Sequence, residues 1–185
     1  MNNEVLNDEF LKSIDSNYEF SNKPIRRLKK SQQPGEIKLQ LENLKKQIAE
    51  IDACDLKNHA NQLVFSDGNF RSKIMLVGEG PGQKEDEIGK PFMGDAGKLL
   101  NKMLAAIDIK RESIYITNVV NYRPPNNRKP TTAEINKYSK FLYEHISIIN
   151  PKILIIMGGT AMEALIGNNF NCLLYTSDAA DDTRS

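Results

Sequence analysis

The chain has 185 residues, of which 39% are apolar and 26% charged, and its formal charge is +1. This length suffices for one domain with a proper core, and the near-zero charge excludes a global field that would attract nucleic acid. The longest apolar run (153–157) is too short for a bilayer, no export signal opens the chain, and two cysteines cannot form a disulfide framework. We therefore expect a cytoplasmic protein without a membrane partner.

The N-terminal segment is polar. Residues 1–35 are rich in Asn, Ser, Lys and Glu, which predicts a disordered or weakly helical leader. A basic cluster at 26–30 could contact nucleic acid, but short basic runs of this kind are more often solvated.

The rest of the chain alternates between helical and strand patterns. Apolar residues at 37, 41, 44, 48 and 51 follow the period of an amphipathic helix. An irregular connection follows, with a turn at 67–69, and then a continuous apolar run at 73–79 that is typical of a buried parallel strand. Further on, we expect helices over 96–107, over 131–149 after a capping box at Thr131, and from Gly159, with strands at 113–120 and 152–159.

This alternation predicts an α/β fold: a three-layer αβα arrangement around a central, mainly parallel sheet. Ligands of such sheets bind beyond the carboxyl ends of the strands. The segments 78–82, 118–123 and 158–160 should therefore share one edge and surround one pocket.

The glycine-rich segment 78–94, GEGPGQKEDEIGKPFMG, fits a phosphate cradle poorly. Its glycines at 78, 80 and 82 match neither the P-loop nor the dinucleotide fingerprint, and acids follow at 85–87. Glycine lets backbone approach a flat ligand, Phe92 could stack on it, and Asn118 could pair with its edge. A nearby carboxylate could position water, so the combination favours a nucleobase. Each residue alone also fits an ordinary structural role: a tight turn, a core aromatic, a turn cap or a solvated acidic face.

Three long motifs resemble one known family. GEGPGQKEDEIGKPFMGDAGKLLNKML (78–104), YITNVVNYRPPNNRKPT (115–131) and PKILIIMGGTAMEALIG (151–167) closely resemble family 4 uracil-DNA glycosylases, over roughly residues 40–167. In detail the chain looks most like an alphaproteobacterial branch of that family. The resemblance implies the family's glycosylase-like αβα fold and an enzyme that cleaves the N-glycosidic bond of a uracil flipped out of DNA.

The resemblance also implies roles for individual residues. Those matching the catalytic acids and the pocket floor are Glu79, Glu85 and Asp86. Those matching the uracil-binding positions, with the stacking aromatic and the amide that reads the base, are Gly80, Pro81, Gly82, Phe92 and Asn118. We expect contacts to the DNA backbone from Arg123, Arg128 and Lys129.

One departure concerns the iron–sulfur cluster that the family carries on four cysteines. The corresponding positions here are Ile51, Cys54, Tyr122 and Tyr138. One thiolate cannot hold a [4Fe–4S] cluster, so we expect no metal, no other cofactor, and a Cys54 that packs as a small apolar residue.

The second departure concerns the C-terminus. The family continues to a further strand and a motif whose histidine donates to the departing uracil, whereas this chain ends NNFNCLLYTSDAADDTRS. Its only histidines, His59 and His145, lie elsewhere. We expect an incomplete domain over 36–170 and a non-native tail over 171–185, although a genuine divergent end is the alternative.

The sequence thus predicts a monomeric uracil-DNA glycosylase of base excision repair, with uracil-containing DNA as its partner and activity impaired by the missing motif. The alternative is a module that binds uracil or damaged DNA without cleaving it.

Overall fold

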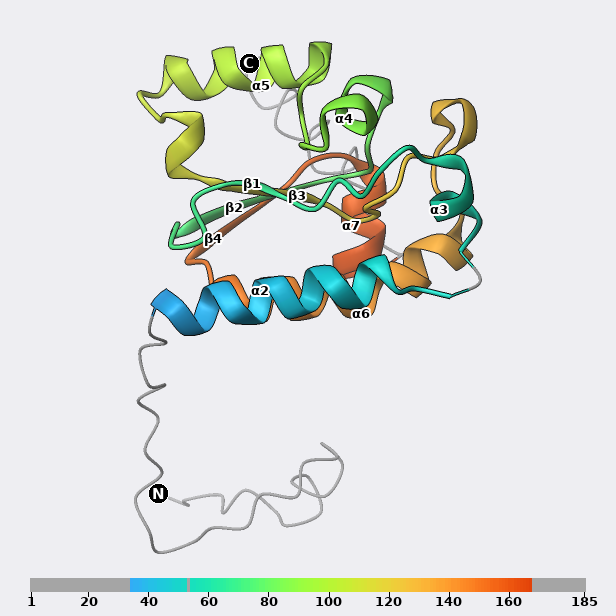
Figure 1. Cartoon of the computed structure of the whole chain (residues 1–185). Coiled ribbons are helices and arrows are strands. Elements are labelled where there is room, and N and C mark those ends of the chain that lie inside the picture. Colours follow the sequence, from blue (N-terminus) through green and yellow to red (C-terminus); the bar gives the residue numbers. More distant parts are fainter. Residues whose placement is uncertain (1–33, 53, 168–185) are drawn as a thin grey trace, which may run out of the picture. The chain divides into compact units, whose positions relative to one another are not determined.

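The structure, a computed structural model, describes residues 34–52 and 54–167 (Figure 1). Most of the expected leader and the whole expected tail over 171–185 lie outside these residues. Within them, the expected αβα arrangement with a mainly parallel sheet is confirmed.

The sheet has four strands in the order β1-β3-β2-β4. Their bounds are β1 Asp67–Gly68, β2 Ile74–Gly78, β3 Tyr115–Asn118 and β4 Ile153–Ile156. The central β2 pairs in parallel with both β3 and β4, so the carboxyl ends of these three strands lie at one edge. The short β1 pairs antiparallel with β3, where the sequence predicted only a turn. Two residues are too few to show the alternation by which strands are recognised in a sequence.

Six helices surround this sheet in the described residues. Their bounds are α2 Pro34–Ala49, α3 Asp55–His59, α4 Gln83–Ile88, α5 Asp95–Ala106, α6 Thr132–Ile149 and α7 Gly159–Ile166. The expected helices α2, α5, α6 and α7 are confirmed. The short α3 and α4 were not expected, because each has only one apolar residue and so shows no apolar period.

The two faces of the sheet are covered differently. The larger apolar cluster lies between the sheet and α2, α6 and α7, while α5 covers the opposite face with a smaller cluster (Figure 1). The expected capping box is confirmed at the start of α6, where Thr131 and Glu134 exchange hydrogen bonds. This cap fixes where the Pro-rich loop after β3 ends.

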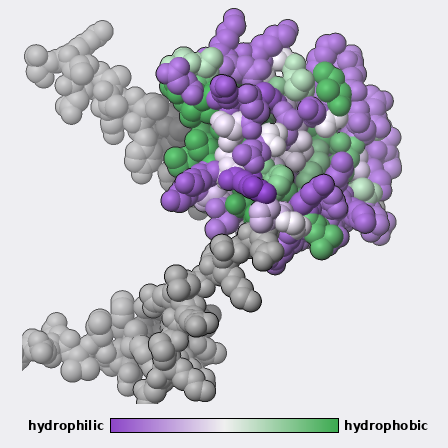
Figure 2. Space-filling model, turned by 60° about the vertical axis from the view of Figure 1, so that its left-hand side comes forward, coloured by the Kyte–Doolittle hydropathy of each residue, from purple (hydrophilic) through white to green (hydrophobic). Residues whose placement is uncertain are grey.

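The edge strand β4 is only partly buried, and Ile153 at its start is 54% exposed. Apolar side chains on α5 are also exposed, among them Leu99 and Met103. On the face shown in Figure 2, hydrophilic residues predominate and hydrophobic patches lie among them. Among residues 34–52 and 54–167, no helix has the length and apolar character that crossing a membrane requires.

Candidate active site

A pocket of about 420 Å³ lies at the carboxyl ends of the parallel strands. Its lining residues are Glu79, Gly80, Gly82, Glu85, Phe92, Gly94, Asp95, Ala96, Asn118 and Met157. The expectation that the segments after β2, β3 and β4 meet at one edge is thereby confirmed. Met157, which directly precedes the expected segment 158–160, lines the pocket, whereas no residue of 158–160 does. Thr160 of that segment instead donates a hydrogen bond to Glu79.

Phe92 and Asn118 meet because Gly78 has no side chain. A Cβ atom placed on Gly78 would lie 2.6 Å from Asn118 Oδ1 and 2.6 Å from two ring atoms of Phe92. Real Cβ contacts are not this short, so only glycine at the end of β2 lets the ring and the amide approach so closely. An aromatic face and an amide therefore lie together at the wall of the pocket.

Asn118 has an unusual hydrogen-bonding state. The residue is 4% exposed, and its Nδ2 atom is buried without a hydrogen-bond partner in the described part of the chain. A buried donor left unpaired costs about 1–3 kcal/mol, so native structures seldom keep one without a reason. A ligand with a carbonyl acceptor would satisfy this amide.

Glu79 is one of two exposed carboxylates that line the pocket; the other, Asp95, pairs with Lys98 on α5. One oxygen of Glu79, Oε2, accepts a hydrogen bond from Thr160 Oγ1. Thr160 is buried at the start of α7, so the β4–α7 junction fixes the orientation of this carboxylate. No sequence pattern predicts this pairing, beyond the expectation that both segments lie at one edge of the sheet.

Glu85 lines the same pocket but binds the backbone. Its Oε1 accepts from the N–H groups of Met93 and Gly94, at 2.7 Å each, and its Oε2 accepts from Gly82 N–H at 3.1 Å. Burial raises the pKa of this carboxyl, but the hydrogen bonds from Gly94, Met93 and Gly82, together with its own backbone N–H, outweigh burial and lower the pKa overall. Glu85 therefore stays ionised and holds the loop around the pocket.

Asp86 does not line the pocket. It is 1% exposed and accepts hydrogen bonds from Asn61 N, Asn61 Nδ2 and Gln62 N. Pro81, which the resemblance placed among the uracil-binding positions, is also buried and is not among the lining residues. Nothing in the placement of Asp86 supports the catalytic role that the sequence suggested for it.

The three expected DNA-backbone cations already have partners in the protein. Arg128 donates to both oxygens of Glu134, at 2.8 and 2.7 Å, and Lys129 Nζ lies 3.3 Å from Glu163. Arg123 Nε donates to Asn127 Oδ1 at 2.7 Å. A phosphate would have to compete with the carboxylates at Arg128 and Lys129, so Arg123 is the best placed of the three.

Neither histidine belongs to the pocket. His59 is exposed at the end of α3, while His145 on α6 is 2% exposed and shares a 2.6 Å hydrogen bond with the Tyr115 hydroxyl. Residues 168–185, where the sequence departs from the family's histidine motif, lie outside the described residues.

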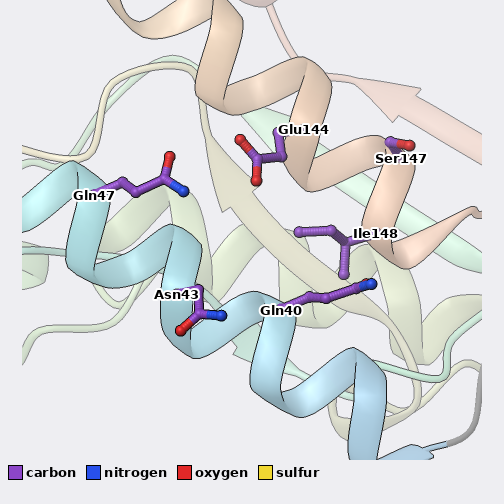
Figure 3. Close-up of a pocket in the computed structure, with 6 residues that line it drawn as sticks. All are labelled: Gln40, Asn43, Gln47, Glu144, Ser147 and Ile148. Carbon is purple, nitrogen blue, oxygen red and sulfur yellow. The ribbon is translucent and has the colours of Figure 1, made fainter.

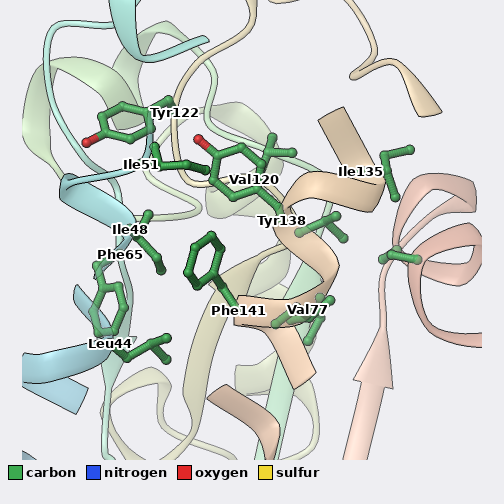
Figure 4. Packing of buried hydrophobic residues seen from close by; sticks show 14 of the residues in the cluster. Leu44, Ile48, Ile51, Phe65, Val77, Val120, Tyr122, Ile135, Tyr138 and Phe141 are labelled. Carbon is green, nitrogen blue, oxygen red and sulfur yellow. The ribbon is translucent and has the colours of Figure 1, made fainter. Parts of the chain in front are cut away.

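The four positions that match the family's cluster ligands do come together. Ile51, Cys54, Tyr122 and Tyr138 are all buried in the larger apolar cluster, and three of them are labelled in Figure 4. Cys54 Sγ lies 3.2 Å from the Tyr138 hydroxyl. Among the described residues, no group of three or more Cys, His, Asp or Glu could hold a metal. The residues at this site do not fit an iron–sulfur cluster.

A second pocket, of about 300 Å³, lies between α2 and α6 (Figure 3). Its lining residues are Gln40, Asn43, Gln47, Glu144, Ser147 and Ile148. It lies away from the carboxyl ends of the strands and has no aromatic residue on which a base could stack. The pocket at the strand ends is therefore the candidate active site.

The family model of the uracil DNA glycosylase superfamily matches residues 65–181 of the chain. The chain belongs to the uracil DNA glycosylase superfamily. Within that superfamily it is 41% identical over 126 residues to a type-4 uracil-DNA glycosylase of Thermotoga maritima, covering 68% of this chain and 66% of the relative. A type-4 enzyme of Archaeoglobus fulgidus is 42% identical over 123 residues, covering 66% and 62% of the two chains. A third, of Pyrobaculum aerophilum, is 38% identical over 128 residues, covering 69% and 65%.

The match to these superfamily members is partial in length. The chain spans between 62% and 66% of these three relatives. Membership of the superfamily agrees with the αβα fold and with the place of the pocket beyond the carboxyl ends of the strands.

Proposed function

We propose that this protein is a uracil-DNA glycosylase that binds a uracil flipped out of DNA in the pocket at the strand ends and hydrolyses its N-glycosidic bond. The observation that carries the proposal is the buried, unpaired Nδ2 of Asn118, which lies beside the ring of Phe92. Uracil offers a planar face for the ring and a carbonyl acceptor for the amide.

The carboxylates support different parts of this chemistry. Cleavage of the glycosidic bond builds positive charge on the sugar and negative charge on the departing base. Glu79, which is accessible and oriented by Thr160, is suited to stabilise the sugar cation and to orient water. Glu85 uses its charge to fix the backbone that encloses the base. Asn118 and backbone N–H groups near the pocket are suited to receive the base anion.

The remaining features concern where and how the protein acts. Its substrate is uracil-containing DNA, with Arg123 as the first candidate for a phosphate contact, and we expect a cytoplasmic monomer. Light scattering of the purified protein would detect a larger assembly.

We also propose that the protein works without an iron–sulfur cluster. The apolar packing of Ile51, Tyr122 and Tyr138 around Cys54 supports this, because the site has one thiol and tyrosines that are buried. Stoichiometric iron and acid-labile sulfide in anaerobically purified protein would refute the proposal.

The function is tested by incubating the protein with a labelled oligonucleotide that contains one uracil and resolving abasic product on a gel after alkali. Because the chain spans about two thirds of its relatives, the assay should include the longest protein encoded at the same locus. Abasic product is expected, and its absence from both proteins would refute the glycosylase. Specific binding to uracil-containing DNA without cleavage would instead favour a non-catalytic binding module.

Asn118→Asp tests the reading of the base. The substitution replaces an amide donor by an acceptor, so discrimination against cytosine should fall by about 10- to 100-fold, the range for a hydrogen bond worth 1.5–3 kcal/mol. Single-turnover rates on uracil- and cytosine-containing oligonucleotides give the ratio. An unchanged ratio would exclude Asn118 as the residue that reads the base.

A further inference from the structure

We propose that Arg111, together with Asp67, positions the base-stacking ring of Phe92 by holding the backbone carbonyls on which that ring depends. The proposal rests on the function proposed above, since it assigns Phe92 the face against which the base lies. It adds a residue outside the pocket lining, on the one-turn 3₁₀ helix Arg111–Ser113 that precedes β3.

Phe92 has a backbone conformation that needs support. Its φ is +54°, in the left-handed region that bulky side chains rarely adopt. Such a conformation costs of the order of 1–3 kcal/mol and persists only where the surroundings impose it. If the loop relaxed, the ring would leave its place beside Gly78 and Asn118.

The carbonyl side of the loop is held by Arg111. Its Nη2 donates to Pro91 O at 2.7 Å, and its Nη1 donates to Phe92 O at 3.1 Å. The N–H side is held by Glu85, which accepts from Met93 and Gly94. The Arg111 guanidinium thus binds the carbonyl groups of this short turn, and the Glu85 carboxylate binds its N–H groups.

Arg111 is itself fixed. Its Nε donates to Asp67 Oδ2 at 3.0 Å, and Nη1 also donates to Asn101 Oδ1 at 3.2 Å. Only 18% of the Arg111 side chain and 19% of the Asp67 side chain are exposed. The planar fork of a guanidinium can bind Asp67 and both carbonyls simultaneously, whereas the compact ammonium of lysine cannot reproduce that geometry.

The first test uses fluorescence and does not depend on catalysis. The chain contains no tryptophan, so Phe92→Trp introduces a single reporter at the ring position. Adding Arg111→Lys to this variant should shift the emission maximum to longer wavelength and raise acrylamide quenching at least about twofold, because the ring becomes mobile. Lys110→Ala, an exposed neighbour in sequence, is the control and should change neither. Unchanged emission and quenching in a folded protein that carries both Phe92→Trp and Arg111→Lys would overturn the proposal.

The second test asks whether Arg111 acts through Phe92. Arg111→Lys should lower the single-turnover rate at saturating uracil-containing DNA by about 10- to 100-fold, as expected for a misplacement of about 1 Å. In a Phe92→Ala background the same substitution should have less than about a twofold further effect. Equal effects in both backgrounds, measured well below the melting temperatures, would indicate general destabilisation and overturn the proposal.

The two tests separate this proposal from the proposed function. Suppose that neither the original protein nor any variant releases uracil, but the fluorescence changes as expected. The proposed glycosylase function is then refuted, and the positioning of residue 92 by Arg111 stands. If the protein releases uracil and the fluorescence is unchanged, the glycosylase function is supported and the positioning role of Arg111 is refuted.

Discussion

At the scale of single residues, the buried titratable groups divide into those that serve the pocket and those that serve the core. His145 belongs to the core: it is 2% exposed, stacks on Phe65 with ring centroids 4.6 Å apart, and shares a hydrogen bond with Tyr115. Burial lowers the pKa of His145 to about 3 from its ordinary 6.5, because the apolar surroundings disfavour the imidazolium. This histidine is therefore neutral in the folded protein at physiological pH.

The low pKa of His145 predicts a loss of stability in mild acid. Between about pH 6.5 and pH 3 the unfolded state binds a proton that the folded state does not, so acid favours unfolding there. At about 1.4 kcal/mol per pH unit, the free energy of unfolding should fall by about 2–3 kcal/mol from pH 7.5 to pH 4.5. Urea denaturation at a series of pH values measures this slope.

His145→Gln is the matched variant, because an amide can still hydrogen-bond to the Tyr115 hydroxyl but does not titrate. From pH 7.5 to pH 4.5, the free energy of unfolding of this variant should therefore lack the fall of about 2–3 kcal/mol that His145 causes in the original protein. Equal slopes for the two proteins would show that another group causes the acid sensitivity.

At the scale of elements, the contact between α5 and the turn that contains Phe92 (residues 91–94) depends on Gly97. A Cβ atom placed on Gly97 would lie 1.9 Å from Phe92 O and 2.2 Å from Phe92 C, both of them backbone atoms. The helix therefore approaches the turn as closely as backbone allows, and the pocket wall and α5 form one packed unit. In the sequence, Gly97 looks only like a weak point in a helix.

Gly97→Ala should destabilise the protein even though alanine favours helices. Intrinsic propensity would stabilise by up to about 1 kcal/mol, but overpacking against a backbone carbonyl costs about 1–3 kcal/mol or more. Thermal and urea denaturation should show the net loss. Gly35→Ala in α2, where the added atom meets nothing within 4 Å, is the control and should leave stability equal or higher. Equal changes in stability for Gly97→Ala and Gly35→Ala would contradict the close contact between Gly97 and Phe92.

At the scale of the whole molecule, Asp86 connects segments that are distant in sequence. It joins α4 to the segment after α3 by accepting hydrogen bonds from Asn61 and Gln62, and Gln62 Nε2 also donates to the backbone carbonyl Asp86 O at 3.0 Å. The connection spans 25 residues between Asn61 and Asp86. Asp86 therefore contributes to the assembly of the fold, while its neighbour Glu85 contributes to the pocket.

Asp86→Asn should thus affect stability far more than catalysis. Removing a buried charge that accepts several N–H groups leaves donors unsatisfied, at a cost of about 2–4 kcal/mol. The single-turnover rate on uracil-containing DNA, measured well below the melting temperature, should change by less than about threefold.

Glu79→Gln is the comparison for Asp86→Asn and should show the opposite pattern: a small change in melting temperature and a rate loss of about 100-fold. A large rate loss for Asp86→Asn at unchanged stability would support the catalytic role that the resemblance implies for Asp86.

The sequence by itself determined the layers of the fold, since long apolar periods and capping residues are local. The strands β2, β3 and β4, the helices α2, α5 and α6, and the shared strand edge all follow from such patterns. The motif resemblance further identified the family to which the chain belongs. These features need no knowledge of what lies far away in the chain.

Only the tertiary structure decided what each charged residue does. Glu85 and Asp86 are adjacent and chemically alike, yet successive helical side chains point about 100° apart, so one reaches the pocket loop and the other reaches Asn61. Arg111 carried no signal at all, because its partners Asp67, Pro91 and Phe92 are brought to it by the fold. Hydrogen bonds and ion pairs depend on distances between segments, which periodicity does not encode.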